Sequence, residues 1–220
     1  MLSGGAASGT AIGFGGMQTV SSGGTDFGTT VGSGGSELVM SGGTAANAVI
    51  AGGTLEIADG GKLAGAVDFA GSGTLKIDGA AMPAATVSGF GVGQTIDLTG
   101  VAYDGAGSAT LAAGNVLQVS EGGQTYSLAL DPTQNYAGHG FALANDGHGG
   151  TKIVDPTSSF TVANQTDLDN AIRSIDVGGS NVGLSAYTIN FNAPINPTGD
   201  LPTLNLTTDL EAINLPSGFR

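Results

Sequence analysis

Two histidines and one nearby carboxylate are the residues of this sequence that could ligate a metal ion. His148 lies two residues after Asp146 in a glycine-rich stretch, and His139 precedes both. A structural zinc site requires about four converging nitrogen, sulfur or oxygen ligands, and a glycine-rich turn leaves its side chains in solvent. The calcium-binding nonapeptide GGxGxDxUx is also absent. We therefore expect solvated turn residues here and predict neither a metal site nor a cofactor.

Polysaccharide-cleaving chemistry would require carboxylates clustered on one face, with a basic residue beside an acidic sugar. The sequence shows no close pairing among the acids considered for this role, which are Asp59, Asp68, Asp78 and Asp97. The bases are widely scattered, at Lys62, Lys76, Lys152, Arg173 and Arg220. No catalytic residue is predicted. Acids gathered beside Lys62 or Lys76 in a groove would favour an enzyme.

The overall composition excludes several classes of partner. The net charge is −13, charged residues make up 10%, and there is no Cys. Without a basic patch to neutralise phosphates, nucleic acid is not an expected partner. No run of about 18 apolar residues occurs, so no helix is expected to cross a membrane. No signal peptide precedes the repeats, and Met1 is interpreted as an added start on an excised fragment.

The residues that must position any site are organised by a repeat of glycine pairs. Every second pair recurs after 18 or 19 residues, as the pairs begin at Gly4, Gly15, Gly23, Gly34, Gly42, Gly52 and Gly60. A fixed period of this length is typical of a solenoid, in which each repeat adds one layer. Glycine supplies positive φ at sharp turns and lets one backbone lie close above another.

Short alternating runs between the pairs predict strands with one inward and one outward face. The apolar residues taken to mark these faces are Leu38 and Met40, Leu55 and Ile57, and Leu75 and Ile77. Small residues are expected to fill a narrow interior, at Ala45, Ala46, Ala48 and Ala51. Hydroxyl residues follow the glycine pairs at Thr25, Ser36, Thr44 and Thr54. They are predicted to stack in register, as structural ladders, as sugar carriers or as a repetitive binding face.

The segments 20–25, 40–45 and 50–55, which read VSSGGT, MSGGTA and IAGGTL, resemble the 19-residue repeats of AIDA-type autotransporter adhesin passengers of Gram-negative bacteria. The resemblance covers about residues 3–80. It implies an all-β, right-handed parallel β-helix displayed outside the cell. The membrane β-barrel of that family is not recognisable in this sequence.

Beyond residue 80 the period fades, and three regions are expected: 1–80 as the repeat solenoid, 81–157 as its β-rich continuation, and 158–220 as a further module. Glu121–Gln124, between two alternating runs, predicts a hairpin turn. The segment 93–154 also resembles one that recurs in large bacterial surface proteins.

The third region, 158–220, predicts the one helix of the chain. Leu168, Ala171, Ile172 and Ile175 recur at helical spacing, Asn164 or Thr166 is a candidate cap, and Gly178-Gly179 ends the run. With the strands expected at 159–162 and 187–191, this order resembles the opening of a pectate-lyase-like β-helix with a short capping helix.

The sequence therefore favours a non-catalytic, extracellular adhesin passenger that acts as a structural rod for surface attachment or cell–cell adhesion. Its expected partner is a receptor or glycan on a host or bacterial surface, with possible self-association. A self-assembling β-solenoid fibre or matrix subunit is the first alternative. A pectate-lyase-like enzyme acting on polysaccharide is the second.

Overall fold

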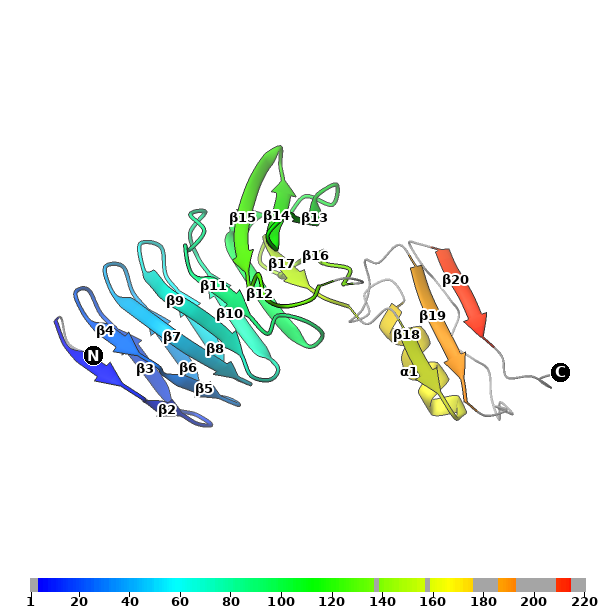
Figure 1. The fold of residues 1–220 in the computed structure, drawn as a ribbon, viewed down its shortest axis with the longest axis horizontal. Coiled ribbons are helices and arrows are strands. Elements are labelled where there is room, and N and C mark those ends of the chain that lie inside the picture. The colour runs from blue at the N-terminus through cyan, green and yellow to red at the C-terminus, as the bar shows by residue number, and fades with distance from the viewer. Residues whose placement is uncertain (1–3, 137–138, 157–158, 176–185, 193–208, 215–220) are drawn as a thin grey trace. The chain divides into compact units, whose positions relative to one another are not determined.

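The computed structural model of the chain describes residues 4–136, 139–156, 159–175, 186–192 and 209–214. By internal contacts the chain divides into two units, Met1–Asp155 and Pro156–Arg220. The first unit is a β-solenoid of parallel coils (Figure 1), which confirms the expected fold. The second is a small sheet with one helix.

Two sheets run along the coil stack of the first unit. One contains five parallel strands: β3 (Met17–Val20), β6 (Ser36–Val39), β8 (Thr54–Ile57), β10 (Gly73–Ile77) and β12 (Gln94–Ala102). Two antiparallel strands follow, β17 (Gly150–Val154) and then β16 (Ala142–Asn145). The other begins with seven strands: β1 (Ala6–Ser8), β2 (Ala11–Ile12), β4 (Thr25–Phe27), β5 (Thr30–Gly32), β7 (Thr44–Ala51), β9 (Lys62–Phe69) and β11 (Thr86–Ser88).

The predicted hairpin is present beyond the repeats. β14 (Val116–Glu121) and β15 (Gln124–Leu130) pair antiparallel around Gly122 and Gly123, both at positive φ, and β13 (Ser108–Ala112) pairs with β14. β15 also joins the stack through β11. Figure 1 shows β14 and β15 extending beyond the coils.

The two glycines of a pair have different tasks, as the structure of Gly42-Gly43 shows. Gly42 has a φ of 75°, and its N–H donates to the Gly60 carbonyl in the next coil (2.9 Å). A Cβ on Gly43 would lie 2.5 Å from the Val20 carbonyl oxygen of the preceding coil. The first glycine therefore makes the turn and the second permits the close stacking of coils.

The apolar core of the first unit lies inside the coils, in columns that run along the stack. One column consists of Val20, Val39, Ile57, Ile77 and Leu98. The neighbouring inward column reads Gln18, Glu37, Leu55, Leu75 and Ile96. Ala45 and Ala48 are buried as expected, whereas Ala46 and Ala51 are half-buried.

For strand β6, the prediction that Leu38 and Met40 mark the inward face is wrong. In β6, Glu37 and Val39 are fully buried and Leu38 is half-buried, and Met40, directly after the strand, is 45% exposed. Leu38 pairs in register with Glu56 and not with an inward residue of β8. Because side chains alternate with a period of two, an error of one residue in the register exchanges the inward and outward faces of the whole strand.

The second unit contains three parallel strands, β18 (Ser159–Val162), β19 (Ala186–Phe191) and β20 (Asp209–Asn214), and helix α1 (Gln165–Ile175). Asn164 is the helix cap, because its Oδ1 accepts a hydrogen bond from the Asp167 N–H (2.9 Å). The predicted apolar face of the helix is buried with Val162, Tyr187 and Ile189. The predicted stop at Gly178-Gly179 lies outside the described residues.

Candidate functional site

The outward face of the sheet built on β3, β6, β8, β10 and β12 carries a column of hydroxyl groups. Its members follow one another in register from coil to coil: Ser36, Thr54, Thr74 and Thr95. This confirms the predicted stacking for Ser36 and Thr54. Thr25 and Thr44 stack on each other in the other sheet.

A second outward column alternates in charge. Its members are Glu56, Lys76, Asp97 and Lys152, each opposite the next across four adjacent strands. The Lys76 ammonium lies 2.7 Å from Glu56 Oε1 and 3.1 Å from Asp78 Oδ1. Burial alone would lower the pKa of Lys76, but the bonds to Glu56 and Asp78 outweigh it and raise that pKa.

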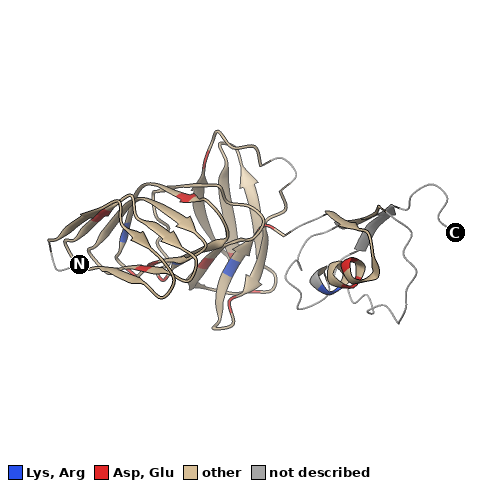
Figure 2. Cartoon of the chain, turned by 90° about the horizontal axis from the view of Figure 1, so that it is seen from below, with Lys and Arg blue, Asp and Glu red and all other residues tan. Residues whose placement is uncertain are grey.

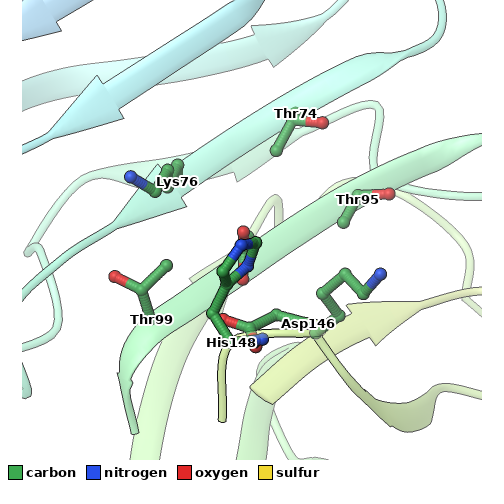
Figure 3. A pocket seen from close by; sticks show the side chains of 8 residues that line it. Thr74, Lys76, Thr95, Thr99, Asp146 and His148 are labelled. Atoms are coloured by element: carbon green, nitrogen blue, oxygen red, sulfur yellow. Dashed lines mark hydrogen bonds between the residues drawn. The ribbon is translucent and has the colours of Figure 1, made fainter. Parts of the chain in front are cut away.

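The two columns meet in an open groove of about 570 Å³ across β10, β12 and β17. Figure 3 shows the side chains that line it: Thr74, Lys76, Thr95, Asp97, Thr99, Asp146, His148 and Lys152. Thr99 Oγ1 donates to Asp78 Oδ1 (2.8 Å), which holds this hydroxyl at the groove. Two lysines and two aspartates line the same space, so their formal charges cancel.

Asp97 is the acid of the groove whose carboxylate is least well satisfied by hydrogen bonds. It is half-buried, and its Oδ1 is buried with no hydrogen-bond partner among the described residues. Burial raises the pKa of Asp97, and Asp146 adds to that rise, while Lys152 and Lys76 oppose it. Asp97 is therefore the groove carboxyl that most readily takes up a proton or a hydrogen-bond donor.

Asp146 is held by its own turn. Its Oδ1 accepts hydrogen bonds from the His148 N–H (2.6 Å) and the Gly150 N–H (2.8 Å). The His148 bond is the main cause of the lowered pKa of Asp146. His148 itself is exposed, as expected for a turn residue.

The other histidine lies elsewhere in the first unit. His139 Nδ1 is 2.5 Å from Asp155 Oδ2, and the ring packs against Tyr136 and Phe141. Burial, followed by the charges of Asp131 and Asp155, raises the pKa of Tyr136 to about 12. The two histidines are thus not brought together. In the part of the chain that the structure describes, no group of three or more His, Cys, Asp or Glu could hold a metal ion.

Of the four acids considered for polysaccharide cleavage, the structure brings two together beside Lys76 and leaves the other two apart. Asp78 and Asp97 lie beside Lys76, whereas Asp68 is exposed on β9 and Asp59 lies in an exposed turn with Lys62 nearby. Figure 2 shows that basic residues are few on the described chain, and two of them, Lys76 and Lys152, line the same groove. Sequence reasoning missed the roles of Asp146 and Lys152, because antiparallel strand β17 and the turn before it bring these residues to β12 from a distant part of the chain.

Among the described residues, no helix is long and apolar enough to span a bilayer. The chain matches no protein-family model, no curated protein and no solved structure.

Proposed function

We propose that this chain is part of a non-catalytic, extracellular adhesin passenger, and that its groove binds a polar polysaccharide. The observation that carries the proposal is the continuity between rod and groove. The hydroxyl and charged columns of the coils run directly into the groove lining. The extracellular setting is supported by the resemblance of the glycine-pair repeats to AIDA-type passengers.

The coil stack suits a rod that holds a binding surface away from a cell. Each coil contacts mainly its neighbours, so length is added without a new core. Turn amides also bond along the stack, as the Gly23 N–H does to the Gly42 carbonyl (2.8 Å). On a surface displaying many such rods, weak contacts would sum through effective concentration.

The groove lining fits a hydroxyl-rich ligand. Threonine hydroxyls both donate and accept hydrogen bonds, the aspartates accept and the lysines donate. No Phe, Tyr or Trp is among the lining residues, so the groove lacks the large aromatic surfaces that line most pockets for apolar ligands. Because the lining charges cancel, the expected ligand is a neutral or mixed-charge glycan and not a polyanion.

The test is binding to a glycan array, followed by titration of any ligand found. Removal of one groove contact, by Lys152→Ala or Thr95→Val, should weaken binding about tenfold, the equivalent of one hydrogen bond to a charged partner. Lys62→Ala is the matched control, because Lys62 is exposed outside the groove. Binding to no glycan, or equal losses in all three variants, would contradict the proposal.

A second candidate is a polysaccharide-cleaving enzyme, and one observation favours it. The pKa of Asp97 is raised and that of Asp146 is lowered in the same groove. Such a separation is the pattern of a general acid and a general base. Against this candidate, Asp146 Oδ1 already accepts two backbone hydrogen bonds that hold its turn, so its low pKa has a structural cause.

The release of new sugar ends from bound polysaccharide separates the two candidates. If the chain is an enzyme, Asp97→Asn should abolish the release of ends while binding persists. If it is a binding rod, no ends should appear with either protein.

A further inference from the structure

Two acidic side chains lie inside the second coil, Glu37 between Gln18 and Leu55 of the adjacent coils and Asp26 on the other sheet. Glu37 occupies the inward position that Leu55 and Leu75 take in later coils. Asp26 lies between Ala7 and Ala45 in its own column. Both acids are fully buried, with 0% of their surface exposed.

Three of the four carboxyl oxygens of these acids lack donors in the described part of the chain. Neither oxygen of Asp26 has a hydrogen-bond partner among the described residues, and neither does Glu37 Oε2. The Gln18 amide Nε2 lies 3.3 Å from Glu37 Oε1 and 3.4 Å from Oγ1 of buried Thr29. No described Lys, Arg or His forms an ion pair with either acid.

A count of charges and lone pairs indicates what could satisfy this cluster. One proton shared between the two carboxyls would leave one buried negative charge and one oxygen without a partner. Two protons would neutralise the pair and could satisfy its oxygens, but they would require both carboxyls to stay protonated at neutral pH, far above the usual pKa of Asp and Glu. An unpaired buried charge is strongly unfavourable, whereas a bound divalent cation would neutralise both carboxylates and could accept their unpartnered oxygens as ligands.

The ligand types select among cations. All the available donors are oxygens: two carboxylates, the Thr29 hydroxyl and, after rotation of its amide, the Gln18 carbonyl oxygen. Hard cations prefer such ligands. Calcium accepts irregular sets of six to eight oxygens with bidentate carboxylates, whereas magnesium retains several waters. We propose that Asp26, Glu37, Thr29 and Gln18 form a calcium site inside the second coil of the solenoid.

The environment of Glu37 agrees with this geometry. Burial, followed by the charge of Asp26 and by a side-chain hydrogen bond that protonated Glu37 makes with Asp26, raises the pKa of Glu37 to about 8, and the Gln18 bond opposes this rise. This rise reflects two acids held together without a counter-charge, which a bound cation would supply. The site lies away from the groove, so its existence does not depend on the proposed glycan binding.

The experiment is a calcium titration of the full chain after EDTA treatment, followed by calorimetry and by thermal unfolding. One ion should bind per chain and raise the melting temperature, and magnesium should bind at least about tenfold more weakly. Asp26→Asn and Glu37→Gln should each weaken calcium binding by at least about tenfold. Asp59→Asn, which changes an exposed acid, should bind as the unaltered protein does.

Glu37→Leu serves as a variant that is expected to fold, because the next coil has leucine, Leu55, at the same position. This variant should fold by circular dichroism and lose the calcium response. The proposal is overturned if the unaltered protein does not bind calcium. It is also overturned if Asp26→Asn or Glu37→Leu binds calcium as tightly as the unaltered protein.

Discussion

Glu37 and Leu55 occupy the same inward position in adjacent coils, opposite each other in register and both fully buried. A carboxyl group thus lies in a column that is otherwise apolar from Leu55 onward. Replacement of buried charged groups by apolar residues of similar volume is often stabilising by about 1–4 kcal/mol. In calcium-free buffer we therefore expect Glu37→Leu to raise the free energy of unfolding, measured with urea. A less stable variant would show that Glu37 makes a stabilising contact without the cation.

The stability of the calcium-free protein should also depend on pH through Glu37. Its pKa is raised from 4.5 to about 8, so the folded protein holds this proton more tightly than the unfolded chain. The resulting stabilisation is fully present below pH 4.5 and is lost as the pH rises through about 8. Between these values the free energy of unfolding should fall by at most about 1.4 kcal/mol per pH unit. The slope should shrink in Glu37→Leu, and an unchanged slope would assign it to other groups.

The second glycine of a pair should tolerate no side chain. In Gly43→Ala the new Cβ would lie 2.5 Å from the Val20 oxygen and 3.1 Å from the Met40 oxygen, both backbone atoms that cannot move alone. We expect a loss of about 1–3 kcal/mol in the free energy of unfolding. Gly105→Ala is the control, since its Cβ would meet nothing within 4 Å and its φ is not positive. Equal losses in both variants would refute the close-stacking role.

Asn47 forms a corner at which the two preceding coils have glycine. Its φ is 51°, against 64° for Gly9 and 69° for Gly28, and its Oδ1 accepts a hydrogen bond from the Ala66 N–H (3.1 Å). Asn47→Gly should cost about 1 kcal/mol for the lost bond. Asn47→Ala should cost about 1–2 kcal/mol more, because alanine is strained at positive φ. Chemical denaturation of both variants tests this order, and a reversed order would contradict it.

The parts of the fold that the sequence predicted are those with local causes. The glycine pairs specify turns through φ and close approach, Gly122-Gly123 specifies a hairpin, and Asn164 caps a helix whose apolar face recurs at helical spacing. These signals lie within a few residues of one another, so they need no knowledge of the stacking partner.

The parts that could not be predicted depend on register and on distant pairing. At the end of β6, apolar residues occupy three consecutive positions, Leu38, Val39 and Met40, so hydrophobicity could not decide which face of the strand was inward. The groove forms only because β17 returns antiparallel beside β12 and places Lys152 opposite Asp97. No feature of 150–154 in isolation indicates that direction.

The alternating column from Glu56 to Lys152 restricts how this rod can change length. Deletion of the single coil that carries Lys76 would place Glu56 beside Asp97, so two carboxylates would face each other at a half-buried position. Deletion of two successive coils would instead place Glu56 beside Lys152 and preserve the alternation of sign. Between β8 and β17, the solenoid can therefore lose coils most readily in even numbers.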